Sequence, residues 1–336
     1  MALKDIIGQE KAVSMLQGIL KRERLAGAYL FCGESGIGKK TTAMNFAKAV
    51  NCLHAGGRSS DEQVGFLLTP DPQSPIPAFD ACEVCDSCLK INAGSHPDVV
   101  MIAPEERIIK IEEIRIIEEA LSFRPFEGKK KTVIVDDADS MNSAAANAFL
   151  KTLEEPTEDS LIILISSRPD RLPATIRSRC SKVPFHTHSQ SSCSDILKKK
   201  MGDKEAALAS RLSLGRPGIA FSSDVREERD WFMDLLWAMT KAEKDRWSSR
   251  DEMDKWFDLA LAFMRDLAVY RITGGTYLIN TDLSEAVEKL GKSLDVQGII
   301  ELYKELSFIK NMLLFNLNKS LTWNYTASLL RKELYS

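Results

Sequence analysis

Short apolar runs alternate with helix-like periodicity over the first half of the chain. Three of these runs are candidates for buried strands: 28–31, 132–137 and 161–166. Between the second and the third, residues 140–155 place Phe149 and Leu153 on one helical face, and Pro156 ends that helix. This alternation predicts an α/β domain built on a parallel sheet.

The pattern changes toward the end of the chain. From about residue 196 onward there is no further strand candidate, and from 227 to 335 apolar and tryptophan positions recur every three or four residues. Trp256, Leu259 and Phe263 show this spacing, which is typical of core packing in a helix bundle. Residues 53–81, rich in Gly, Ser, Asp and Pro, interrupt the first half and predict a surface excursion.

Composition and charge exclude several classes of protein. The 336 residues carry 45 Lys and Arg against 48 Asp and Glu, a net charge of −3, so this is not a polybasic nucleic-acid binder and any DNA contact must be local. No apolar run approaches the roughly 20 residues that span a bilayer, and the N-terminus is charged too early for a signal peptide. Four of the seven cysteines are spaced as a metal site, which points to a reducing compartment. We therefore expect a cytoplasmic protein without membrane contact.

A glycine-rich segment directly follows the first strand candidate and precedes a predicted helix at 39–50. It fits the G-x4-G-K half of a phosphate-binding loop, with Gly33, Gly36, Gly38 and Lys39 at the defining positions. In such a loop the glycines let backbone N–H groups surround phosphate oxygens, and the lysine reaches the β and γ oxygens. The strand–loop–helix setting favours this interpretation over a chance glycine-rich turn.

The positions that would hold Mg²⁺ depart from the usual pattern. Lys40 stands where P-loop enzymes have Ser or Thr, and its ammonium has no lone pair for a cation; Thr41 is one residue late, about 100° around the helix. Asp136, at a strand end, is placed to bind Mg²⁺ through water. Asp137 falls where many ATPases have the water-activating Glu, but its side chain is one methylene shorter. We expect poor or absent ATP hydrolysis, and the sequence leaves open whether nucleotide binds.

The cysteine cluster predicts a structural metal site. Three thiols lie within seven residues, and a fourth ends the predicted 39–50 helix: Cys82, Cys85, Cys88 and Cys52. The first three are too close for easy disulfides, and four thiolates suit a closed tetrahedral Zn²⁺ site. An Fe–S cluster is a minor alternative, because the fourth Cys and the Pro of the ferredoxin run are missing. His54 or His96 could replace Cys52 as a ligand.

Taken together, these segments resemble the AAA+ clamp-loader subunits of bacterial DNA polymerase III, and within that family the delta-prime branch. The resemblance covers roughly residues 5–220 and rests on IIGQEKAV, AYLFCGESGIGKKT, the four cysteines, VIVDDADSMNSAAANAFLKTLEEP and LPATIRSRC. It implies an AAA+ nucleotide-binding domain at 1–184 with a zinc module at 52–88, a small helical lid at 185–224, and an all-α collar at 225–336. The collar is similar to the family only as a helical region.

The resemblance also gives a role to Arg179. In Ser178-Arg179-Cys180 the family's arginine projects onto the γ-phosphate held by the neighbouring subunit, so Arg179 is the expected arginine finger, acting in trans. A surface ion pair is the alternative for this residue, and Arg177 is a weaker candidate for the finger.

Two further positions of the family fall on this chain. Ser166 or Ser167 lies where the family has a polar sensor at a strand end. Gly218 stands where ATP-hydrolysing relatives have a second sensor arginine, and Arg216 is out of register. This is another departure from a self-contained ATPase.

Three functions are open at this stage. The first is a stationary subunit of the polymerase holoenzyme that braces a pentameric loader, joining the gamma/tau and delta subunits through its collar. It would present Arg179 to the neighbouring ATPase and help load the sliding clamp on primed DNA. The second is an active gamma/tau-type ATPase, in which Asp137 is the base and Thr41 compensates for Lys40. The third is an unrelated P-loop enzyme such as a nucleotide kinase. The departures at Lys40, Asp137 and Gly218 favour the first. The basic runs at 129–131 and 198–200 are expected to be solvated faces.

Overall fold

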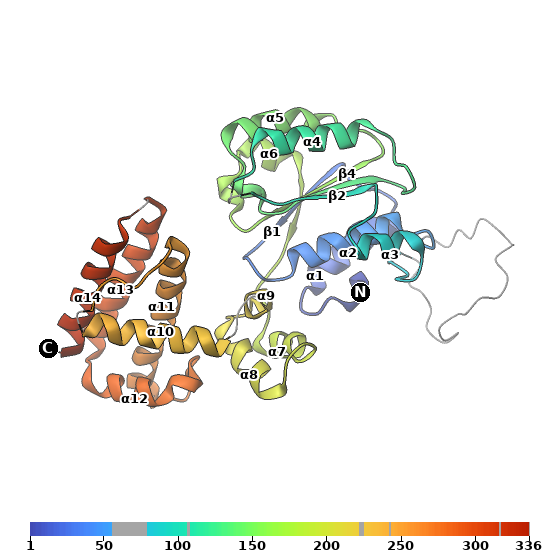
Figure 1. Cartoon of the computed structure of the whole chain (residues 1–336). Coiled ribbons are helices and arrows are strands. Elements are labelled where there is room, and N and C mark those ends of the chain that lie inside the picture. Colours follow the sequence, from blue (N-terminus) through green and yellow to red (C-terminus); the bar gives the residue numbers. More distant parts are fainter. Residues whose placement is uncertain (56–78, 106–107, 222–224, 242, 316, 336) are drawn as a thin grey trace. The chain divides into compact units, whose positions relative to one another are not determined.

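The computed structural model describes all residues except 56–78, 106–107, 222–224, 242, 316 and 336, so most of the predicted excursion at 53–81 lies outside the described residues. The chain forms two compact units (Figure 1), which are Met1–Ile196 with Gly215–Ile219, and Leu197–Leu214 with Ala220–Ser336. The division into domains at 1–184, 185–224 and 225–336 stays a prediction.

The first unit is built on a parallel five-stranded sheet. Its strands are β1 (Ala28–Cys32), β2 (Val99–Ile102), β3 (Lys131–Val135), β4 (Ser160–Ser166) and β5 (Ser181–Pro184). The strand order is β2-β3-β4-β1-β5, and every pair in it is parallel. The predicted α/β class is confirmed, and the three predicted strands are β1, β3 and β4. The two edge strands, β2 and β5, were not predicted.

Helices cover both faces of this sheet (Figure 1). They are α1 (Glu10–Lys21), α2 (Lys39–Asn51), α3 (Asp86–Asn92), α4 (Ile111–Ser122), α5 (Ser143–Glu154) and α6 (Ala174–Arg179). Because successive strand residues point to opposite faces, Phe31 packs with α1 and α2, whereas Leu30 packs with α4, α5 and α6. The central strands read as continuous apolar runs because both of their faces are buried.

The carboxyl ends of the parallel strands meet at one edge of the sheet. The glycine-rich loop follows β1, Asp136 follows β3, and Ser166 ends β4, which lies between those two strands. Ligand sites of open α/β sheets form at this edge. The fold therefore brings the predicted phosphate loop and the predicted carboxylates together.

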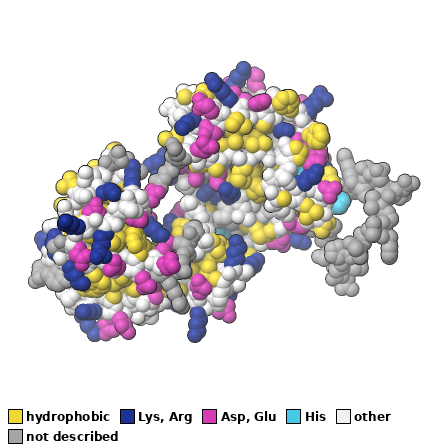
Figure 2. Space-filling view, viewed as in Figure 1, with side chains coloured by type: hydrophobic (Ala, Val, Ile, Leu, Met, Phe, Trp, Pro, Cys, Tyr) yellow, Lys and Arg dark blue, Asp and Glu magenta, His cyan; other side chains and the backbone are white. Residues whose placement is uncertain are grey.

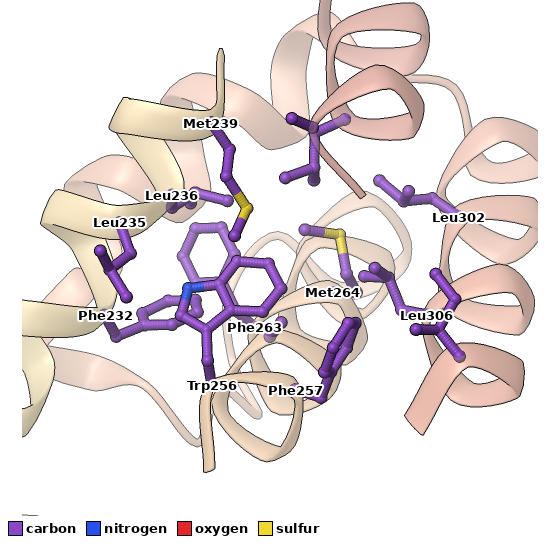
Figure 3. Close-up of a cluster of buried hydrophobic side chains, with 14 of the residues drawn as sticks. Phe232, Leu235, Leu236, Met239, Trp256, Phe257, Phe263, Met264, Leu302 and Leu306 are labelled. Carbon is purple, nitrogen blue, oxygen red and sulfur yellow. The ribbon is translucent and has the colours of Figure 1, made fainter. Parts of the chain in front are cut away.

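Only helices follow β5 in the described part of the chain. They are α7 (Gln190–Lys198), α8 (Asp203–Leu212), α9 (Pro217–Ala220), α10 (Val225–Thr240), α11 (Arg250–Thr273), α12 (Ser284–Ser293), α13 (Val296–Met312) and α14 (Lys319–Tyr335). In the second unit α11 packs on α12 and α13, and α14 packs on α10 and α13. Trp256 is fully buried beside Phe232 and Phe263 in this core (Figure 3). The prediction that the aromatic stripes are core positions is confirmed.

The surface carries no dominant sign of charge on the face that Figure 2 shows, because basic and acidic side chains are interspersed over it. None of the helices within the described ranges combines the length and the apolarity that a membrane-spanning segment needs.

Candidate functional site

The phosphate loop has the predicted setting between β1 and α2. Gly36 and Gly38 adopt positive φ angles of 78° and 96°, a conformation that L side chains rarely adopt. Gly38 is also the residue before the first turn of α2, so the helix N-terminus faces the loop. The backbone therefore has the form that cradles an anion.

Lys39, however, is engaged by its own loop. Its Nζ donates hydrogen bonds to the carbonyl oxygens of Gly33, at 2.6 Å, and of Glu34, at 2.5 Å, and the residue is only 6% exposed. Burial lowers the pKa of its ammonium, while the nearby carboxylates, Asp137 first, oppose that shift. The predicted phosphate-binding cation is thus present and is satisfied by backbone carbonyls.

Lys40 takes the position next to Asp136 that a cation would need. Its Nζ lies 3.1 Å from Oδ2 of Asp136, whose side chain is 19% exposed. Thr41 is exposed, and the hydroxyl of the next residue, Thr42, donates to the Gly38 carbonyl at 2.9 Å. The carboxylate expected to bind Mg²⁺ therefore already pairs with an ammonium, and neither hydroxyl is offered to it. These residues do not fit a Mg²⁺ ion.

Two further aspartates, Asp137 and Asp139, lie at this edge, and the carboxylate of Asp139 has hydrogen-bond partners. Asp137 follows directly in a left-handed conformation, with φ 44° and ψ 49°. Ser166 donates its hydroxyl to Oδ1 of Asp139 at 2.6 Å, and the backbone N–H of Ser167 donates to the same oxygen at 3.1 Å. The predicted sensor serines are therefore tied to Asp139. Sequence reasoning did not single out Asp139, although it is the third Asp of the DDAD segment.

A later segment of the first unit closes against the phosphate loop. The N–H of Gly218 donates to the carbonyl oxygen of Gly36 at 2.8 Å, and a Cβ at Gly218 would lie 2.8 Å from that oxygen and from the Gly36 Cα. Arg216 places Nε 3.8 Å from Oε2 of Glu34 in the loop. The absence of a side chain at 218 thus permits a backbone approach that an arginine there would prevent.

The four predicted cysteines form one cluster. The sulfur atoms of Cys52, Cys82, Cys85 and Cys88 all lie within 4.8 Å of one another and could hold a metal ion. Tetrahedral Zn²⁺ with bonds of about 2.3 Å needs sulfurs about 3.8 Å apart, so the cluster fits that ion after a small contraction. Backbone N–H groups point at two of the sulfurs, from Cys82 to Cys52 Sγ at 3.4 Å and from Cys85 to Cys82 Sγ at 3.3 Å. Such contacts orient metal ligands.

Of the four thiols, that of Cys52 is poised to lose its proton. A hydrogen bond from Cys88 lowers the pKa of Cys52 to about 4, and the same contact together with burial raises the pKa of Cys88. One thiolate is therefore stable beside its neighbours without an ion, whereas a bound metal would require the others to release their protons as well.

Buried polar side chains attach the cysteine cluster to α2 and to the sheet. Lys48, fully buried on α2, donates to Oε1 of Glu83 at 2.7 Å and to the Asn92 side-chain oxygen at 2.8 Å. Asn51 donates to the Thr132 hydroxyl at 3.2 Å. These residues were not singled out from the sequence, because a lysine or an asparagine in a helical pattern ordinarily indicates a solvated position.

The basic run at 129–131 is less solvated than expected. Lys131 is only 12% exposed at its side chain, and its Nζ lies 3.0 Å from Oδ1 of the fully buried Asp98. Backbone N–H groups of Phe126, Glu127 and Gly128 also donate to Asp98, at 2.7–2.8 Å. Burial alone would raise the pKa of Asp98, but these hydrogen bonds outweigh it and lower that pKa to about 2. Lys131 is a structural ion-pair partner.

Arg179 ends α6 and is held by two contacts. Its Nη2 forms an ion pair with Oε1 of Glu154, at the end of α5, and its Nη1 donates to the Thr175 carbonyl at 2.9 Å. The ion pair named as the alternative to a finger is therefore present. The side chain remains 33% exposed. Arg177 pairs instead with Asp170 at 3.3 Å.

Comparisons with known proteins agree with the resemblance. A family model described as "DNA polymerase III, delta subunit" matches residues 8–65 and 71–189, more than half of the chain. DNA polymerase III subunit delta' of Bacillus subtilis (strain 168) is 27% identical over 296 residues, which cover 84% of this chain and 83% of that protein. DNA polymerase III subunit tau of the same organism is 36% identical, but over 54% of this chain and 28% of its own length.

A solved structure with a similar course of the chain is a DNA polymerase III gamma subunit-related protein from Thermotoga maritima. The alignment covers 96% of this chain and 99% of that protein's chain, with 20% identity and a TM-score of 0.47. The similarity to subunit delta' extends over most of both chains, whereas the similarity to tau is restricted to about half of this chain.

Proposed function

Because the chain belongs to the DNA polymerase III delta-subunit family, we propose that it is a clamp-loader subunit that does not turn over ATP itself and assists hydrolysis by a neighbour. In this role the helical region at 225–336 joins the gamma/tau and delta subunits as a collar, and the assembled loader acts on the sliding clamp and on primed DNA in the cytoplasm.

The contact between Lys40 and Asp136 carries this proposal. An ammonium 3.1 Å from the carboxylate supplies locally the positive charge that a metal ion would bring, but it cannot bind nucleotide oxygens as a metal does. Lys39 is satisfied by its own loop, and Gly218 meets Gly36 at backbone distance. All three contacts favour a phosphate loop that does not support ATP hydrolysis.

The same observation speaks against the alternative of an active gamma/tau-type ATPase. Such an enzyme would need Thr41 to replace the missing hydroxyl, but Thr41 is exposed one position further along α2. The 36% identity to a tau subunit covers 54% of this chain and leaves the departure at Lys40 in place.

We propose further that the four cysteines hold a structural Zn²⁺. The ion would bridge the end of α2 to the segment that leads into α3. Lys48 already joins α2 to Glu83 in that segment, and Asn51 joins the end of α2 to Thr132 of β3. A four-thiolate site leaves no open coordination position, so the metal would stabilise the fold without taking part in a reaction.

Arg179 is the group proposed to act on the neighbour. A guanidinium brought to a γ-phosphate neutralises the charge of the transferring group, and such arginines contribute about 10³–10⁵ in rate. Arg179 is partly exposed, as this role requires.

ATP turnover tests the proposal. We expect near-zero turnover by the isolated chain. In the reconstituted loader, Arg179→Ala should abolish fast hydrolysis at the neighbouring site, while Arg177→Ala, two residues away, should leave it. Substantial turnover by the isolated chain, or an Arg179→Ala loader that is as fast as the native one, would contradict the proposal.

A further inference from the structure

Arg179 is held in one orientation by a residue that neither the family comparison nor the sequence singled out. Glu154 ends α5, lies 25 positions before Arg179 in the chain, and pairs through Oε1 with its Nη2. On the other side of the guanidinium, Nη1 donates to the Thr175 carbonyl at 2.9 Å. Two directions of hydrogen bonding therefore fix the plane of the group.

The backbones that carry the two side chains are fixed to each other by a common core. Leu153 of α5 and Ile176 of α6 are 4% and 0% exposed and belong to the same buried cluster, as does Cys180, the residue after Arg179. Glu154 directly follows Leu153. Packing of α5 on α6 therefore sets the distance between the carboxylate and the guanidinium.

An exposed ion pair of this kind contributes little to stability, about 0–1 kcal/mol. Its effect on orientation is larger, because a free arginine side chain has many rotamers and loses that freedom when it meets a ligand. A guanidinium has five N–H donors in a planar fork. The bonds to Glu154 and Thr175 occupy two of them, so an oxyanion can be bound while the restraint persists.

We propose that Glu154 is a positioning residue for Arg179, which it holds in the orientation needed to meet a phosphate on the neighbouring subunit. This rests on the proposed function. It reconciles the two interpretations of Arg179, because the ion pair and the finger are then one arrangement. Pre-orientation of a catalytic group raises the rate without changing how tightly substrate binds.

The test uses the reconstituted loader with Glu154→Ala and Glu154→Gln, and with Glu155→Gln as the matched control on the adjacent, exposed carboxylate. We expect Glu154→Ala to lower kcat for ATP about tenfold, with KM within twofold and an unchanged melting temperature of the chain. Glu154→Gln retains a hydrogen-bond acceptor and should fall between Ala and native; Glu155→Gln should equal native. Combined with Arg179→Ala, Glu154→Ala should have no additional effect.

The outcomes separate the two proposals. If Arg179→Ala slows the loader but Glu154→Ala does not, or makes it faster, the positioning role is wrong and the proposed function stands. A kcat loss accompanied by a lower melting temperature, or one that adds to that of Arg179→Ala, also overturns the positioning role. If Arg179→Ala itself has no effect, the proposed function fails.

Discussion

Replacing Lys40 by threonine should give the predicted phosphate loop of the isolated chain a binding response to Mg²⁺. The change removes the ammonium that lies 3.1 Å from Asp136 and supplies the hydroxyl that P-loop enzymes have at this position. In the native chain a cation approaching Asp136 meets a positive charge that already occupies the carboxylate. The threonine variant removes that competition.

The magnitude follows from the charges. Two unit charges about 4 Å apart interact by about 1 kcal/mol in water, so an ammonium and a divalent ion would repel each other by about 2 kcal/mol. Because the Lys40 side chain is 54% exposed, the aqueous value applies. A difference of about 2 kcal/mol is a factor of ~30 in affinity. We therefore expect Mg²⁺ to strengthen nucleotide binding by Lys40→Thr about 10–30-fold relative to its effect on the native chain.

The assay is a titration with a fluorescent ATP analogue, with and without Mg²⁺. Lys40→Met is the matched control, because it removes the charge at similar length without adding a hydroxyl. It should show the gain that comes from charge removal, and any excess in Lys40→Thr measures the hydroxyl. An identical response to Mg²⁺ in native and Lys40→Thr chains would refute the reasoning. It would mean that the ammonium does not limit cation access to Asp136.

Two further predictions concern buried groups. The native chain should contain about one zinc by elemental analysis. Cys85→Ser should lose the metal and melt at a lower temperature, while Cys32→Ser, outside the cluster, should keep it. A native chain that is fully folded without metal would contradict the assignment. Asp98→Asn should lower the free energy of unfolding in urea by about 2–3 kcal/mol at pH 7, because a pKa shifted from 3.8 to about 2 stabilises the folded state by about 2 kcal/mol. Because folding lowers the pKa of Asp98, its contribution to the free energy of unfolding is full above about pH 4 and is lost as pH falls toward 2. The native chain and Asp98→Asn should therefore become equally stable near pH 2. Equal urea midpoints of the two chains at pH 7 would exclude a stabilising role for the Asp98 carboxylate.

The central strands and the phosphate loop could be predicted from the sequence because their signals are local. Buried parallel strands such as β4 are continuous apolar runs, and a glycine-rich loop between such a run and a helix is typical of phosphate binding. The edge strand β5, Ser181–Pro184, was missed because only one of its four residues is buried and it contains a lysine and a proline. Its place in the sheet is set by pairing with β1.

The missed parts of the site depend on contacts between distant positions. The residue types at positions 40 and 136 were evident from the sequence, but the contact of Lys40 with Asp136 joins residues 96 positions apart and exists only once β1 and β3 lie in the same sheet. Glu154 is one of two adjacent glutamates before a proline, and no pattern distinguishes the one that meets Arg179. Lys48 is buried only because Glu83 and Asn92 surround it.

Under the proposed function, the close approach of Gly218 to Gly36 would also make independent ATP turnover difficult to acquire. Any residue other than glycine at 218 would place its Cβ 2.8 Å from the Gly36 backbone, so the loop or the segment would have to move first. A single exchange to arginine would thus disrupt present packing before it could contribute to a reaction, and the hydroxyl absent at position 40 would still be missing. Independent turnover would therefore require a change at position 40 together with a change at 218 and a matching shift of the Gly36 loop.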